Sequence, residues 1–253
     1  MLIDVHCHLN LYLNIEEVLQ EAQRNGIEKI IAVSMSQISL QRVMEISEHY
    51  DMIYPALGIH PEEIKMNEKL EQNLENILTY IRAKKDDICA IGEIGLDHHF
   101  IKDNSLYPLQ TKVFEAMLSL AHELQLPVNL HTKGAEKEVF DLLPSFDIPH
   151  VNIHWYSGPA VYLDQGIERG YFFSITPAIQ YSPAVKKVVE RVDKDLLLLE
   201  SDGPVKYSGR VGVPAMIKEV LDVVSQLKNI DKEELQAQIE KNTRTIFPNV
   251  FFD

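Results

Sequence analysis

Short apolar runs alternate along the whole chain with segments in which apolar residues recur every three or four positions. The eight runs are Leu2–His8, Lys29–Val33, Met52–Ile59, Ile88–Glu93, Pro127–His131, His150–His154, Tyr171–Ile175 and Leu196–Glu200. Most of them are rich in Leu or β-branched residues and lack strict polar alternation, which is typical of strands buried on both faces of a parallel sheet. The pattern therefore predicts eight buried strands.

The segments between these runs predict amphipathic helices. Two apolar stripes at helical spacing are Leu70, Leu74, Ile77 and Ile81, and Leu109, Val113, Met117, Leu120 and Leu124. Asp231 is a predicted N-cap, and it precedes a final helix whose apolar stripe is Leu235, Ile239 and Ile246. Eight strand-then-helix units predict a single (β/α)8 TIM barrel over residues 1–253 with an extra C-terminal helix. A doubly wound open sheet is the alternative, because the number of strands alone does not establish closure.

The composition is that of an ordinary globular protein, with 45% hydrophobic and 25% charged residues. No stretch approaches the roughly 20 apolar residues that a membrane span needs, and no basic region precedes an apolar core near the N-terminus. The two cysteines, Cys7 and Cys89, lie in predicted buried strands, so we expect free thiols and no disulfide framework. These features together predict a cytoplasmic protein without membrane contact.

The net charge of −14 argues against a protein that coats nucleic acid by electrostatic attraction alone. A substrate that carries phosphate is still compatible with this charge, because bound divalent cations can reverse the local sign of a site. The charge therefore disfavours a DNA-coating protein much more than it disfavours a metal-dependent phosphoesterase.

Metal-ligating residue types gather where the predicted strands end. They are His6 and His8 after the first strand, His60 after the third, Glu93 at the fourth, His131 at the fifth, His154 at the sixth and Asp202 after the eighth. In a TIM barrel these strand ends meet at one mouth, where the active site lies. Five of the ten histidines fall at these positions, which predicts a metal centre rather than scattered surface residues.

The candidate ligand set is larger than one tetrahedral metal site uses. Its members are His6, His8, Glu93, His131, His154 and Asp202. Such a set suits two divalent ions about 3.5–4 Å apart, the arrangement that clamps attacking and leaving oxygens in displacement at phosphorus. Glu93 is the predicted bridge, because a carboxylate can give one oxygen to each ion. Asp202 is predicted to bind one ion and to accept a proton from the attacking water.

The order of motifs along the chain resembles the TatD family of metal-dependent deoxyribonucleases, in the amidohydrolase superfamily. The motifs are Asp4-Val5-His6-Cys7-His8-Leu9, Gly58-Ile59-His60-Pro61, Gly92-Glu93-Ile94-Gly95-Leu96-Asp97, His154-Trp155-Tyr156-Ser157-Gly158, Leu199-Glu200-Ser201-Asp202-Gly203-Pro204, and Asn242-Thr243-Arg244 with Phe247. The match runs in order from residue 3 to about residue 247.

This resemblance implies a TIM barrel that hydrolyses DNA phosphodiesters with two divalent cations. It implies that His6, His8 and Asp202 hold one metal, that Glu93 bridges, and that His131 and His154 hold the second. The family often uses Mg²⁺, whereas the imidazole-rich ligand set suits Mn²⁺ or Zn²⁺ equally well. The implied partner is a DNA end or another phosphodiester, bound transiently. Oligomeric state is not predicted.

The loops that would meet the substrate depart from the family pattern. The family usually has His-Ser-Arg-Asp after the fifth strand, where this chain has His131-Thr132-Lys133-Gly134. Here His98-His99 follows Leu96-Asp97, where the family often has an aromatic residue, and Arg210-Val211-Gly212-Val213-Pro214 replaces an Arg-Asn-Glu-Pro-like segment.

The candidate substrate-binding residues are His60, Lys133 and Arg210. Each has a simpler reading as a loop cap or a solvated surface charge. Two functional alternatives remain beside the nuclease: an amidohydrolase-type hydrolase of a small ester, lactone or amide, and a non-catalytic module stabilised by metal.

Overall fold

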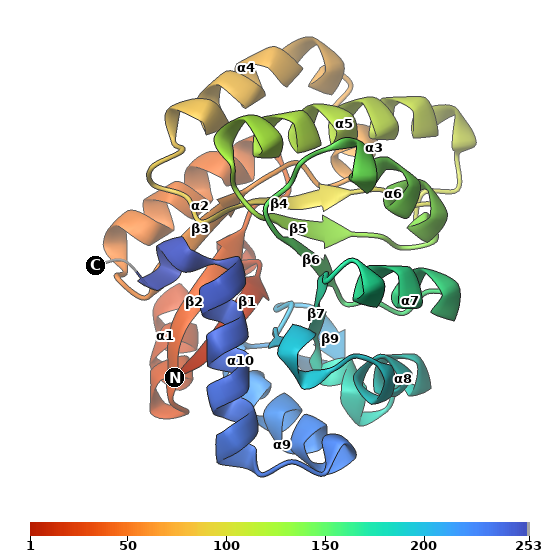
Figure 1. The fold of residues 1–253 in the computed structure, drawn as a ribbon. Coiled ribbons are helices and arrows are strands. Elements are labelled where there is room, and N and C mark those ends of the chain that lie inside the picture. The colour runs from red at the N-terminus through yellow and green to blue at the C-terminus, as the bar shows by residue number, and fades with distance from the viewer. Residues whose placement is uncertain (252–253) are drawn as a thin grey trace.

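The computed structural model describes residues 1–251 of the chain. Eight parallel strands lie side by side in the order in which they occur along the chain (Figure 1). They are β1 (Leu2–Cys7), β2 (Ile27–Val33), β3 (Ile53–Leu57), β4 (Ala90–Gly95), β5 (Val128–His131), β6 (Val151–His154), β7 (Phe172–Ile175) and β8 (Leu197–Leu199). This order excludes the doubly wound sheet, in which the strand order reverses, and confirms the predicted (β/α)8 barrel.

Hydrogen bonds between β1 and the segment that follows β8 bring the two ends of the sheet together. The amide of Asp202 donates to the carbonyl of His6 at 2.9 Å, and the amide of His8 donates to the carbonyl of Gly203 at 2.8 Å. The Asp4 carboxylate accepts the amide of Ser201 at 2.9 Å. The closure therefore places the first and last predicted ligand segments next to each other.

Helices surround the strands on the outside of the barrel (Figure 1). They are α1 (Ile15–Arg24), α2 (Gln37–His49), α3 (Glu63–Met66), α4 (Leu70–Ala83), α5 (Tyr107–Leu124), α6 (Glu136–Leu142), α7 (Ala160–Glu168), α8 (Pro183–Arg191), α9 (Ile217–Lys228) and α10 (Lys232–Ile246). Short 3₁₀ helices occupy Leu9–Leu11, Asn104–Leu106, Leu143–Ser145, Pro177–Gln180, Lys194–Leu196, Pro214–Met216 and Pro248–Phe251. Helices α4, α5 and α10 confirm the predicted stripes, and Asp231 caps α10 as predicted by accepting the amides of Glu233 and Glu234.

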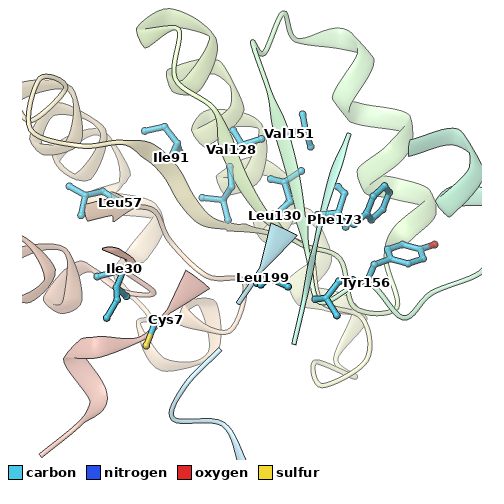
Figure 2. Packing of buried hydrophobic residues seen from close by; sticks show 14 of the residues in the cluster. Cys7, Ile30, Leu57, Ile91, Val128, Leu130, Val151, Tyr156, Phe173 and Leu199 are labelled. Carbon is cyan, nitrogen blue, oxygen red and sulfur yellow. The ribbon is translucent and has the colours of Figure 1, made fainter. Parts of the chain in front are cut away.

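The main hydrophobic core lies between the strands and the helices. Figure 2 shows part of it, with Ile30, Leu57, Ile91, Val128 and Leu199 contributed by different strands. A smaller cluster joins strand residues to side chains of the C-terminal segment: Ile3, Val5, Ile31, Val33, Ala56, Cys89, Ala90, Phe172, Leu198, Ile246, Phe247 and Val250. Both cysteines are buried and free, as predicted.

The C-terminal segment covers the end of the barrel where the strands begin. Asn249 Nδ2 donates to the carbonyl of Ile88, just before β4, and Lys29 Nζ donates to the carbonyl of Val250. Phe247 is fully buried. The predicted site lies at the opposite end, where the strands finish. Within residues 1–251 no helix combines the length and the apolar character that crossing a membrane demands.

A small hairpin follows β8 and was not predicted. Its strands are β9 (Lys206–Tyr207) and β10 (Arg210–Val211), which pair antiparallel. Ser208 and Gly209 form the turn with φ angles of +50° and +87°, the left-handed values that a two-residue hairpin turn requires. Ser208-Gly209 is therefore a pair typical of a hairpin turn, but the pattern of apolar residues alone did not predict the hairpin.

Candidate metal centre

A cavity of about 710 Å³ opens at the ends of the strands, at the mouth of the barrel. Its lining includes the predicted site residues His8, His60, Glu93, His131, Lys133, His154 and Asp202. His6 lies fully buried directly beside them, with its Nε2 atom 3.4 Å from His8 Nε2. All six predicted metal ligands therefore come together at one place, although they are spread along the sequence from His6 to Asp202.

Four ligand atoms converge at the end of β1. His6 Nε2 and His8 Nε2 lie 3.4 Å apart, and each lies 3.4 Å from Glu93 Oε2. Asp202 Oδ1 lies 3.5 Å from His6 Nε2 and 3.3 Å from His8 Nε2. These separations exceed a normal N–H···O hydrogen bond of about 2.7–3.2 Å. His6, His8 and Glu93 form a candidate metal-binding group, and Asp202 lies beside the two imidazoles.

This arrangement fits a divalent cation. His6 Nε2, His8 Nε2 and Glu93 Oε2 form a triangle with edges of 3.4 Å, and the centre of such a triangle lies about 2.0 Å from each corner, close to the length of a zinc–nitrogen bond. The charge of the site agrees with this fit. Burial lowers the pKa of His6, but the carboxylates of Glu93, Glu200 and Asp202 together outweigh burial and raise that pKa to about 10. The carboxylates thus attract positive charge to the position that a cation would fill.

A second group of ligand atoms lies on the other side of Glu93. His131 Nδ1 is 3.0 Å from Glu93 Oε1, and His60 Nε2 is 3.6 Å from the same oxygen and 3.2 Å from His131 Nδ1. His60, Glu93 and His131 form a candidate metal-binding group. The two oxygens of Glu93 therefore face two different groups of nitrogen ligands, which is what a bridging carboxylate needs.

Glu93 is not the last residue of its strand, contrary to the prediction. Strand β4 continues to Gly95, and its register with β5 shifts between Ile91 and Ile94. Such a bulge re-aims a side chain, and here the side chain is Glu93. Gly95 is required for the close approach of β5, since a Cβ at this position would lie 1.9 Å from the carbonyl oxygen of His131.

His154 stands between the two groups. Its Nε2 lies 3.8 Å from Asp202 Oδ2 and 3.9 Å from Glu93 Oε1, and its ring stacks on that of His6 at 3.8 Å. It forms a candidate metal-binding group with His6 and Asp202. The resemblance implied instead that His131 and His154 share one ion, with His60 outside the ligand set. The structure places His60 beside His131.

Buried hydrogen bonds orient the imidazoles from behind. His154 Nδ1 contacts Glu200 Oε1 at 2.9 Å, and His131 Nε2 contacts Asp97 Oδ2 at 2.8 Å. Metal-binding histidines use such carboxylates to fix the tautomer, so that the other ring nitrogen presents its lone pair. Burial raises the pKa of Asp97, but His131 and the hydrogen bonds from the amides of Phe100 and His99 together outweigh burial and lower that pKa to about 2. Asp97 therefore stays ionised behind its histidine.

His6 is oriented by a residue that the sequence analysis did not find. His6 Nδ1 contacts Asn129 Oδ1 at 3.0 Å, while Asn129 Nδ2 donates to the carbonyl of Val5. Asn152 Nδ2 donates to Asn129 Oδ1 and to Ser174 Oγ. All three polar side chains are buried within the barrel. The sequence signal that could have predicted this series of hydrogen-bonded side chains was a single Asn inside each of two short apolar strands.

Lys133 and Arg210, two of the predicted substrate contacts, lie in different places in the structure. Lys133 lines the cavity, where its Nζ donates to Ser157 Oγ at 2.6 Å. Arg210 lies on β10 and is not part of the cavity lining; its guanidinium forms two hydrogen bonds to the Glu219 carboxylate, at 2.9 and 3.2 Å. This pairing leaves the predicted role of Arg210 in substrate binding without support from its position.

Comparisons with known proteins agree with this architecture. The family model described as TatD related DNase matches residues 3–248. A metal-dependent hydrolase of Methanocaldococcus jannaschii is 32% identical over 97% of this chain and 96% of its own length. The deoxyribonuclease TATDN3 of Homo sapiens is 29% identical over 98% of this chain and 95% of its own.

The likeness extends to a solved structure. The crystal structure of YjjV, a TatD homolog from Escherichia coli, matches with a TM-score of 0.89 and 27% identity, covering 98% of both chains. The sequence motifs, the barrel and the ligand geometry at its mouth thus lead to one conclusion. This protein belongs to the TatD-related DNase family and is a metal-dependent hydrolase.

Proposed function

We propose that the protein hydrolyses phosphodiester bonds of DNA with two divalent cations that share Glu93. The observation that carries this proposal is the division of the Glu93 oxygens between two ligand groups, Oε2 toward His6 and His8 and Oε1 toward His60 and His131. Two cations held across one carboxylate suit in-line displacement at phosphorus, where the attacking and leaving oxygens both need stabilisation. Mg²⁺, Mn²⁺ and Zn²⁺ are all compatible with the donor types.

The cations would supply Lewis acidity, withdrawing charge from the phosphodiester and lowering the pKa of the attacking water. The chain itself supplies the positions of the ligands. Glu93 is almost completely buried, and His6 and His154 are held by Asn129 and Glu200 from behind. Little reorganisation is therefore needed when substrate binds, which favours charge stabilisation in the transition state.

Asp202 is the proposed acceptor of the proton from the attacking water. Its Oδ1 faces His6 Nε2 and His8 Nε2, whereas its Oδ2 faces His154. One oxygen is thus directed at a cation position and the other is left for the proton. The residue has a φ of +46°, a left-handed conformation that Asp tolerates better than most residues. The backbone bond from its amide to the His6 carbonyl holds this conformation.

A DNA substrate is favoured over a small ester or amide by the relatives and by the wall of the cavity. The human relative TATDN3 is named a deoxyribonuclease. In the wall, Lys133 supplies a cation at the cavity surface, where a phosphate could be held. A carbonyl substrate would make no equivalent use of this cation.

The proposal is tested by assaying protein purified without chelator on an end-labelled single-stranded oligonucleotide and on a panel of carboxylic esters, lactones and amides. We expect metal-dependent cleavage of the oligonucleotide and rates at background on the carbonyl panel. His131→Ala should lose the activity, and the matched control His122→Ala, at an exposed histidine of α5, should keep it. Turnover of the carbonyl compounds alone would refute the nuclease.

A further inference from the structure

The wall of the cavity beside the ligand His154 is built by Trp155, the single tryptophan of the chain. Its amide donates to Glu200 Oε1 at 2.9 Å, and this is the oxygen that also holds His154 Nδ1 at 2.9 Å. One carboxylate oxygen therefore fixes the ligand imidazole and the indole relative to each other. Trp155 has a φ of +38°, a sparsely populated conformation that persists only where the surroundings impose it.

Lys133 is placed against the same indole. Its Nζ lies 4.9 Å from the ring centroid, and it donates to Trp155 O at 3.3 Å and to Ser157 Oγ at 2.6 Å. An ammonium group has three protons to donate, and these two acceptors use two of them. The third is available to an anion in the cavity, so that the indole and a potential phosphate contact form one unit.

The cavity lining combines polar and apolar side chains. The buried imidazoles and carboxylates at the ends of the strands form its floor. Its rim carries apolar side chains that are exposed to solvent: Leu11 at 52%, Phe100 at 58% and Val205 at 37%. A ligand that joins an anionic phosphate to a flat aromatic ring would match the floor and the rim at once.

We propose that Trp155 is a stacking platform for the nucleobase next to the phosphodiester that is cleaved, and that Lys133 braces the indole and contacts the phosphate. This inference rests on the proposed function and names the part of the substrate that the wall recognises. The centroids of the His154 and Trp155 rings are 6.2 Å apart, a separation that a single nucleotide spans. Because every base has a π-face, such a platform binds without strong base preference.

The first test compares a thymidine dinucleotide with two analogues in which one or the other base is replaced by hydrogen, using the holoenzyme. Base–aromatic stacking corresponds to about a 5- to 150-fold effect. We expect removal of one of the bases to raise KM by this factor in the wild type. Trp155→Leu should raise KM for the parent dinucleotide to the same extent and should add less than about twofold for that baseless analogue. Trp155→Phe should recover much of the loss.

The matched control is Tyr181→Leu, which removes an exposed aromatic ring outside the cavity lining. It should leave KM for all three substrates unchanged. The proposal is overturned if wild-type KM is the same with and without each base. It is also overturned if Trp155→Leu raises KM equally for the parent and both analogues, because that result means a merely structural role for the indole.

A second measurement separates this proposal from the proposed function. Since Trp155 is the single tryptophan, the intrinsic indole fluorescence of the protein reports on this residue alone. We expect saturable quenching by deoxyguanosine monophosphate and none by 2-deoxyribose 5-phosphate, whether or not the protein cleaves DNA. Quenching without cleavage would contradict the nuclease and retain the platform. Cleavage of DNA with no difference between the two ligands would retain the nuclease and overturn the platform.

Discussion

Asp202 is proposed both to bind a cation and to accept the proton of the attacking water. Asp202→Asn keeps the shape and one oxygen ligand but loses the negative charge and the basicity. General-base assistance contributes about 10²–10⁴-fold in rate, so we expect kcat on a defined oligonucleotide to fall by that order with a much smaller change in KM. Steady-state kinetics with metal content measured for each variant provide the check. A near-normal kcat with the cations still bound would exclude the proton-accepting role.

The two loop cations should differ in their effect on substrate binding. Lys133→Ala removes an ammonium group at the cavity surface, so we expect KM to rise with a milder effect on kcat. Arg210→Ala should change KM less than twofold, because its guanidinium is already paired with Glu219 outside the cavity lining. Michaelis–Menten kinetics of both variants on one oligonucleotide decide the matter. Equal increases in KM for the two variants would show that Arg210 does bind substrate.

At the scale of the elements, the C-terminal segment closes one end of the barrel while the metal centre occupies the other. Phe247 is completely buried among strand residues at the closed end. Truncation of such a ring costs roughly 3–5 kcal/mol. We expect Phe247→Ala to lower the free energy of unfolding in urea by this amount and to leave metal content per folded molecule unchanged. A loss of metal binding in the folded variant would show that the two ends are coupled.

The elements were largely predictable because buried parallel strands leave a simple apolar signature. All eight predicted runs overlap a strand, with bounds that agree to within two residues. The β9–β10 hairpin was missed because its strands have two residues each, which is too short for a periodic pattern. The bulge at Glu93 was missed because a register shift depends on the neighbouring strand, and no local pattern of β4 encodes it.

The sequence predicted which residues form the candidate site better than it predicted how these residues are arranged. Strand ends meet at one mouth in any TIM barrel, so the convergence of the ligand residues followed from their positions. The place of His60 beside His131 depends on how the segment after β3 packs against the end of β5, and the supporting Asn129 is polar where the strand pattern calls for an apolar residue. The role proposed for Trp155 was not predicted, because this residue was noted only as part of the motif His154-Trp155-Tyr156-Ser157-Gly158.

For the whole molecule, we expect the fold to survive removal of metal. The ligand residues lie at the strand ends, and neither hydrophobic cluster depends on them. Without a cation, the raised pKa of His6, about 10, lets the imidazole keep a proton near neutral pH and offset part of the charge of Glu93. EDTA should therefore abolish activity and lower Tm while the far-ultraviolet circular dichroism stays helical. Loss of the helical signal on adding EDTA would mean that the metal is structural.

Two cations that share one carboxylate and act together on a phosphodiester are the core of the proposed function. The most direct measurement is a titration of metal-free protein with Mn²⁺, following cleavage of an end-labelled oligonucleotide against equivalents of metal added. We predict a rate that reaches its plateau near two equivalents. In Glu93→Gln, which loses the charge of the bridge, the rate should stay near background across the same range. A plateau at one equivalent, or no cleavage at any metal concentration, would contradict the central claim.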